Sequence, residues 1–169
     1  GKRPVYLPAG RWVDFWSREV IAGPEIRRVE VPLDVMPLYV RANSLIPTIE
    51  PSVYLTEAPF EMVTFDAYLL DGGRGSFDLR DTDGVTHVSA ALEGSRFDLH
   101  VAGVKERIGL RLLPLGDAPA VESVVVNGEQ LSRVNALTIA PDGDAGWARD
   151  RDGTVSLLSP TDGDRFVER

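Results

Sequence analysis

The sequence predicts an all-β fold, an antiparallel β-sandwich, and two observations carry that prediction. Among 169 residues there are 16 glycines and 12 prolines, and no helical apolar period persists for long between them. Apolar and polar residues instead alternate in short runs, as at residues 97–101 and 108–112. Alternation of this kind is typical of strands with one buried face. Many such strands, separated by turn residues, indicate a sandwich.

The other elements follow from the same pattern. The sequence Val124-Val125-Val126 runs into Asn127-Gly128, a dipeptide suited to a tight type I′ turn, and predicts a hairpin. Five Asp-Gly pairs predict turns, because aspartate hydrogen-bonds its own backbone there: Asp71-Gly72, Asp83-Gly84, Asp142-Gly143, Asp152-Gly153 and Asp162-Gly163. Further strands are expected at residues 12–16, 26–31, 38–41, 53–55, 62–70, 76–79, 85–91, 137–139 and 154–158.

Composition excludes several classes of partner. The formal net charge is -8, from 18 basic and 26 acidic residues, so the chain has no source of phosphate-backbone affinity and we expect no nucleic-acid partner. No uncharged stretch approaches the ~20 residues of a membrane span, so we expect no membrane partner. Cysteine is absent, which removes disulfides and thiolate metal sites. No signal segment or initial methionine opens the sequence, so we expect an excised piece of a larger protein, with the cytoplasm favoured.

Charge and proline usage predict two units. Residues 1–41 carry more basic than acidic groups, and the acidic excess lies beyond Arg41. Pro47, Pro51 and Pro59 then punctuate a polar passage that is typical of a connector. We therefore expect a boundary at residue 48, between residues 1–48 and residues 49–169.

No motif predicts catalysis, a metal or a cofactor. A glycosidase-type carboxylate pair needs a cleft that sequence cannot show, and turn roles explain most of the aspartates. Calcium-loop spacing fails for residues 81–84 and 150–153, because aligning each glycine leaves positions one and twelve without acids. We expect His100 to face solvent on a strand and His87 to pack or hydrogen-bond near a turn. The glycine-rich residues 71–75 lack phosphate-loop spacing and predict a hairpin loop.

Trp147 is the one candidate binding residue. Asp144, Gly146 and Arg149 surround it, which makes it the best candidate for an exposed aromatic that stacks on a sugar. Packing in the core or at a sheet edge is the favoured reading, because that is the default for large aromatic side chains.

Two segments resemble a known family. These are Tyr6-Leu7-Pro8-Ala9-Gly10-Arg11-Trp12-Val13-Asp14-Phe15-Trp16 and Pro32-Leu33-Asp34-Val35-Met36-Pro37-Leu38-Tyr39-Val40-Arg41-Ala42-Asn43-Ser44-Leu45-Ile46-Pro47. Their order and spacing resemble the region just after the catalytic barrel in glycoside hydrolase family 31, which holds α-glucosidases and α-xylosidases. Residues 76–84 and 126–128 are similar to the family's distal C-terminal β-domain. Arg18 stands where the family usually has glycine, and Asn43 replaces a frequent glycine, a version associated with the α-xylosidase branch.

The resemblance implies that residues 1–48 are the end of the proximal C-terminal β-sandwich and that residues 49–169 are the distal C-terminal β-sandwich domain. Family members are retaining α-glycosidases whose two catalytic aspartates lie on the barrel, and neither motif is present here. The implied role is therefore non-catalytic, with the parent's catalytic barrel as partner and an α-xyloside or α-glucoside as its substrate. Residues 1–48 should expose an apolar sheet edge that either pairs between copies, giving a homo-oligomer, or folds onto the distal domain. The alternative is a carbohydrate-binding module using Trp147.

Overall fold

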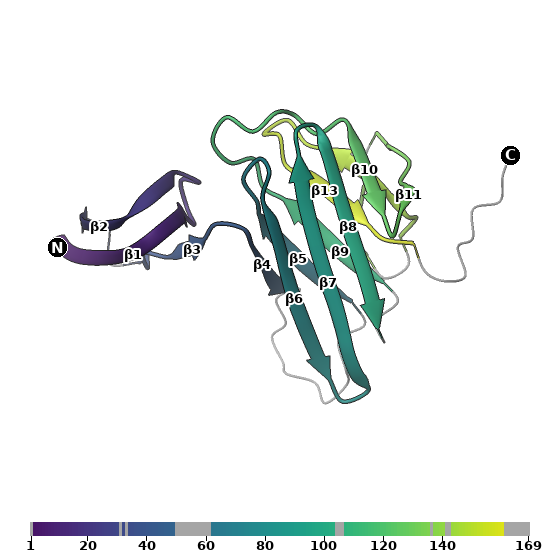
Figure 1. The fold of residues 1–169 in the computed structure, drawn as a ribbon, viewed down its shortest axis with the longest axis horizontal. Helices are drawn as coiled ribbons and strands as arrows, with labels where there is room; N and C mark the ends of the chain where they lie inside the picture. The colour runs from purple at the N-terminus through teal and green to yellow at the C-terminus, as the bar shows by residue number, and fades with distance from the viewer. Residues whose placement is uncertain are drawn as a thin grey trace, which may run out of the picture.

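The computed structural model describes residues 2–30, 32, 34–49, 62–103, 107–135, 137–140 and 143–160. Within these ranges the chain forms thirteen strands and no helix (Figure 1). The predicted all-β class is confirmed. No helix capable of crossing a bilayer occurs in this part of the chain.

The first three strands form a small sheet of their own. They are β1 (Lys2–Asp14), β2 (Val20–Glu30) and β3 (Tyr39–Arg41), in the order β2-β1-β3. β1 and β2 make a long antiparallel hairpin, with an irregularity between Leu7 and Gly10. β3 pairs only with residues 12–14 of β1. In the described part of the chain, no strand pairs with the opposite edge of residues 3–10 or with the outer edge of β2.

The remaining ten strands form a sandwich of two five-stranded sheets (Figure 1). One sheet has the order β12-β13-β9-β5-β4, and the other has the order β11-β10-β8-β7-β6. β5 with β9 and β8 with β10 are parallel pairs, whereas the other pairs are antiparallel. The strands are β4 (Ser44–Thr48), β5 (Val63–Tyr68), β6 (Arg74–Asp81), β7 (Gly84–Glu93), β8 (Arg96–Gly103), β9 (Ile108–Leu112), β10 (Ser123–Val126), β11 (Glu129–Gln130), β12 (Gly146–Arg149) and β13 (Val155–Leu158).

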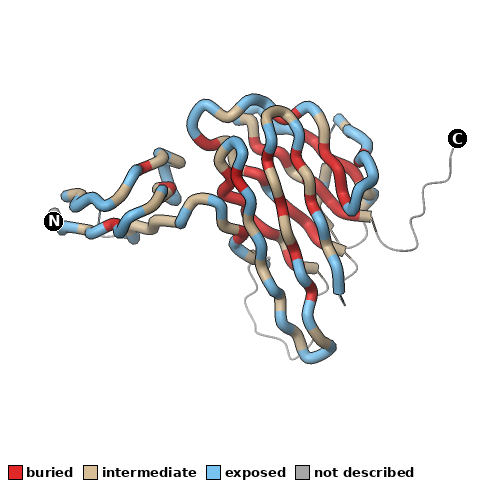
Figure 2. Tube along the Cα trace, in the orientation of Figure 1, coloured by how far each residue is buried: buried red, intermediate tan, exposed pale blue. Residues whose placement is uncertain are grey.

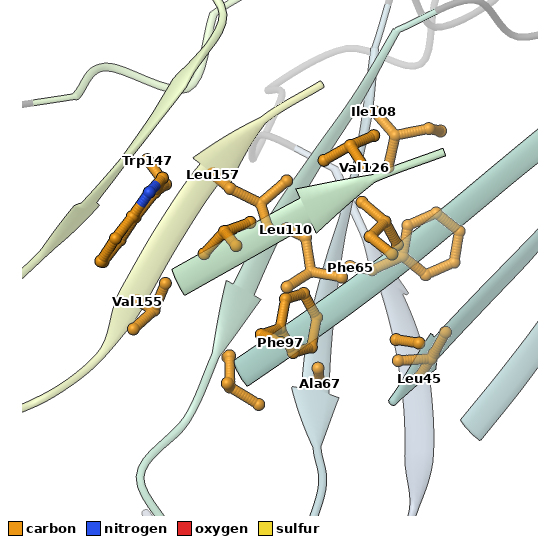
Figure 3. Close-up of a cluster of buried hydrophobic side chains, with 14 of the residues drawn as sticks. Leu45, Phe65, Ala67, Phe97, Ile108, Leu110, Val126, Trp147, Val155 and Leu157 are labelled. Carbon is orange, nitrogen blue, oxygen red and sulfur yellow. The ribbon is translucent and has the colours of Figure 1, made fainter. Parts of the chain in front are cut away.

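The main core lies between these two sheets. Alternate residues of facing strands supply it, as the buried and exposed bands along each strand show (Figure 2). Phe65, Phe97, Leu110 and Leu157 are fully buried in it (Figure 3). Phe65 also meets Phe77 edge to face, with ring centroids 5.7 Å apart.

The chain passes from the small sheet to the sandwich between β3 and β4. β4 pairs with β5 along residues 44–48, so it is already a strand of the sandwich. The change of sheet therefore falls before the predicted boundary at residue 48. Asn43 makes this turn: its φ is 64°, and its Oδ1 accepts a hydrogen bond from the Leu70 amide at 3.1 Å.

Most predicted strands are present, whereas one predicted strand and one predicted loop differ and one prediction is not tested. Residues 137–139 form no strand, which corrects that prediction, and residues 53–55 lie outside the described residues. Residues 69–73 join β5 to β6, which belong to different sheets, so the hairpin loop predicted at residues 71–75 is wrong. Glycine is required at position 73, because a Cβ atom added there would lie 2.2 Å from Asn43 Oδ1. The predicted Asn127-Gly128 hairpin is confirmed, with φ values of 51° and 88°.

Candidate functional site

The contact between the small sheet and the sandwich is the first feature with a functional bearing. Arg18 follows β1 in a turn whose amides are held by Asp14: Asp14 Oδ1 accepts from the Ser17 amide at 2.8 Å. Arg18 adopts φ 62°, and its Nη1 donates to Asp152 Oδ2 at 3.2 Å. The same nitrogen lies 3.4 Å from Thr154 Oγ1. Arg18 therefore ties the small sheet to the β12/β13 turn of the sandwich.

An apolar cluster lies at the same contact. Val13, Tyr68 and Leu115 are buried together, and Val20 and Val40 pack against them. Burial raises the pKa of the Tyr68 hydroxyl above its usual range, with the nearby Asp66 carboxylate adding to this effect. Two sheets thus share a second, smaller core.

The β1/β2 hairpin continues beyond this cluster. β2 runs on from Val20 to Ile26 and beyond, with a cis peptide bond between Gly23 and Pro24. Ile26 pairs across the hairpin with Tyr6, and these side chains are 67% and 63% exposed. Large apolar side chains paired on an open sheet face are typical of an interaction surface.

A polar trough lies on the outer face of β6, β7 and β8. Its volume is about 610 Å³. Small side chains, among them Ser76 and Ser89, form its floor, and Arg74, Asp98 and His100 stand around it. Asp98 is already bound by Arg96, whose Nε and Nη2 donate to its two oxygens at 2.8 Å and 2.7 Å. The predicted solvent-facing position of His100 is confirmed.

His87 lies on the same outer face, exposed, on β7. Its Nδ1 is 2.6 Å from Asp78 Oδ1 on β6, directly across the strand pair. This contact lowers the pKa of the Asp78 carboxyl. The predicted hydrogen bond of His87 is present, although it joins two strands rather than a turn.

A second depression opens at one end of the sandwich. It holds about 650 Å³ between residues 112–121 and the 149–155 hairpin. Leu92, Leu112 and Val155 contribute to its floor, and charged side chains of the hairpin stand at its mouth.

None of these features forms a glycosidase acid and nucleophile pair. A general acid needs a carboxyl whose pKa is raised, whereas Asp78 and Asp152 have lowered pKa values. For Asp152 the main cause is the hydrogen bond from the Thr154 amide. Asp150 and Asp152, the two carboxylates at the end pocket, lie on one turn instead of on opposite walls. Within the described ranges, no cluster of three or more metal-ligating side chains occurs.

Trp147 is not the exposed aromatic that the binding alternative needs. Its side chain is 2% exposed, and Nε1 donates to the Leu131 carbonyl at 3.1 Å. The Arg133 guanidinium covers the ring at 5.2 Å from its centroid. Core packing, the favoured reading, is what the structure shows (Figure 3), and the exposed ring that the sugar-stacking alternative needs is not present at this position. Trp147 belongs to the main core cluster, and the first three residues of β12 are buried while Arg149 at its end is exposed.

Sequence comparisons and structural comparisons both show which proteins this chain is similar to. Residues 1–46 match the model described as "Glycosyl hydrolase family 31 C-terminal domain". The α-xylosidase of Saccharolobus solfataricus is 34% identical over 87 residues, which cover 51% of this chain and 12% of that protein. α-Glucosidase 2 of Bacillus thermoamyloliquefaciens is 33% identical over 85 residues, 50% of this chain and 11% of that protein. The chain thus corresponds to a small part of each relative.

Structural similarity extends further along the chain than the family model does. A Flavobacterium johnsoniae family 31 dextranase superposes with a TM-score of 0.76 at 22% identity, over 96% of this chain and 23% of that one. At that identity the likeness concerns the fold. The family-model match over residues 1–46 and the sequence relatives support a C-terminal region of the glycoside hydrolase family 31 type, and the structural likeness supports its all-β fold over most of the chain.

Proposed function

We propose that the chain is the non-catalytic C-terminal β-region of a retaining α-glycosidase, and that it stabilises a catalytic barrel encoded upstream. The barrel hydrolyses an α-xyloside or an α-glucoside. Support for these substrates comes from the relatives, which are named as an α-xylosidase and an α-glucosidase. Support for the non-catalytic role comes from the lowered pKa values of Asp78 and Asp152 and from the absence, among the described residues, of facing carboxylates in the two depressions.

The observation that carries the proposal is the open face of the small sheet. The family-model match falls on this sheet. One end of the β1/β2 hairpin packs on the sandwich through Val13 and Val20, and the part nearer its open end exposes Tyr6 and Ile26. A barrel surface resting on that end would bury apolar area, and each Å² buried would contribute about 25 cal/mol of favourable free energy. The small sheet would then be clamped between two partners.

Reading the coding sequence upstream of Gly1 tests this proposal. We expect an open reading frame that continues upstream into a (β/α)₈ barrel carrying two catalytic aspartates at the ends of barrel strands. A start codon immediately upstream, or an unrelated domain, would overturn it.

A turnover assay tests the non-catalytic part separately. The purified chain is expected to release no 4-nitrophenol from 4-nitrophenyl α-xyloside or 4-nitrophenyl α-glucoside. Turnover that disappears in an Asp150→Asn or Asp98→Asn variant would place catalysis inside the chain and contradict the proposal.

A further inference from the structure

The pocket at the end of the sandwich has an apolar floor that belongs to the main core. Leu92, Leu112, Val121 and Val155 line it, and each is at most 5% exposed. Its volume of about 650 Å³ lies in the range of small-molecule sites. Because these side chains are almost fully buried, the apolar surface open to a ligand comes from Leu113, Pro114, Ala118 and Pro119, which are partly buried or exposed.

The mouth of this pocket carries three guanidinium groups. Arg133 stacks over Trp147, whereas Arg149 and Arg151 are exposed and form no hydrogen bond or ion pair with another residue of the described ranges. Two carboxylates share the mouth, Asp150 and Asp152. Asp152 is already engaged by Arg18 and Thr154. The mouth is therefore locally cationic on a chain whose formal net charge is -8.

We propose that this pocket binds a small organic anion, a carboxylate attached to an aromatic or branched aliphatic body. The body packs on Leu113, Pro114 and Ala118, and the carboxylate is held by Arg149 and Arg151. Guanidinium groups suit this task because they present planar, paired donors to a carboxylate and are weakly hydrated. The site is separate from glycoside hydrolysis, so it stands or falls independently of the proposed function.

Three probes of nearly equal shape test the charge preference. 4-Phenylbutyrate is an anion, 4-phenylbutanol is neutral and 4-phenylbutylamine is a cation. Each is titrated into the whole chain by calorimetry, with backbone-amide NMR to locate the site. We expect 4-phenylbutyrate to bind most tightly and 4-phenylbutylamine most weakly. We also expect the shifted amides to lie in residues 112–121 and 149–155.

Substitutions at the mouth test the assigned residues. The double variant Arg149→Gln/Arg151→Gln should bind 4-phenylbutyrate about tenfold or more weakly, because two charge-assisted hydrogen bonds are lost. It should leave 4-phenylbutanol binding unchanged. Asp150→Asn should tighten 4-phenylbutyrate binding, because it removes the carboxylate that no described side chain neutralises. Arg80→Gln, on β6 and away from the pocket, is the matched control and should change neither.

Three results would overturn the proposal. The first is equal affinity for all three probes, or no binding of any. The second is amide shifts confined to other parts of the chain. The third is unchanged 4-phenylbutyrate binding in the double variant when its amide spectrum shows a native fold.

Discussion

Arg18 and Asp152 lie 134 positions apart in the sequence, and their side chains meet at 3.2 Å across the contact between the small sheet and the sandwich. Their side chains are 35% and 54% exposed, so solvent screens the pair and it adds only about 0.2 to 1 kcal/mol. The buried cluster of Val13, Tyr68 and Leu115 provides most of the attachment. The ion pair fixes the geometry of that attachment, because it joins one turn of each unit.

Substitution of Arg18 separates the ion pair from the backbone conformation. Arg18→Ala loses the pair but keeps φ 62°, a conformation that costs a side-chain-bearing residue roughly 1 to 2 kcal/mol. Arg18→Gly loses the pair and removes that cost. We expect Arg18→Ala to lower the free energy of unfolding and Arg18→Gly to leave it equal or higher, as measured by urea denaturation. If Arg18→Ala were more stable than Arg18→Gly, the backbone conformation at this position would carry no strain.

Asp152 should make the contact sensitive to acid. Hydrogen bonds from Thr154, followed by the Arg18 guanidinium, lower its pKa below the ordinary value of 3.8. A lowered folded-state pKa contributes stability that is present above the unfolded value and is lost as the pH falls through the folded value. Wild type should therefore exceed Asp152→Asn in unfolding free energy at neutral pH, and the difference should shrink below pH 3.8.

Urea denaturation of both proteins at several pH values measures this difference. Asp83→Asn, at the exposed β6/β7 turn, serves as the control for the change in net charge. A difference between wild type and Asp152→Asn that grows as the pH falls would contradict the assignment.

Trp147 should behave as a core residue. Trp147→Ala is expected to lower the free energy of unfolding by about 3 to 5 kcal/mol, because it opens a cavity between the sheets. Trp147→Phe keeps most of the volume and should lose about 1 kcal/mol from the hydrogen bond to Leu131. Thermal or urea unfolding of the two variants measures both effects. Unchanged stability in Trp147→Ala would mean that the ring is not buried.

Tyr6 and Ile26 should control self-association of the chain. The double variant Tyr6→Ser/Ile26→Ser is expected to change the unfolding free energy by about 0.5 kcal/mol or less, because both side chains are exposed. It should also reduce any association seen by analytical ultracentrifugation, since the exposed pair is removed. Val85→Ser, an exposed apolar residue on the sandwich, is the control. Association that persists in the double variant would place the contact elsewhere.

The strand pattern was predictable where alternation and turn residues agree. Residues 97–101 and the Asn127-Gly128 turn show both signals, and both predictions are confirmed. β4 was not predicted, because Pro47 and its polar neighbours resemble a connector, although the strand tolerates that proline next to β5. β12 was missed because four residues, three of them buried, carry no alternation.

Of the features around the candidate site, the turn roles of the aspartates were the predictable part. Turn chemistry explained the aspartates, and the described Asp-Gly turns at Gly72 and Gly153 have positive φ as expected. Arg18 was noticeable because it stands at a position where the resembling family has glycine, and φ 62° explains that preference. Its contact with Asp152 was not predictable, because nothing local relates residues 134 positions apart. The end pocket was missed for the same reason, since its walls come from four separate segments.

The most direct test of the central proposal is to express the upstream barrel and this chain as separate polypeptides in one cell. We predict that the chain co-purifies with the barrel, raises its thermal midpoint and supports turnover of aryl α-xyloside or aryl α-glucoside, while the chain alone turns over neither. The double variant Tyr6→Ser/Ile26→Ser should co-purify less with the barrel and should raise its thermal midpoint by less. A barrel that is equally stable and active without the chain would contradict the account.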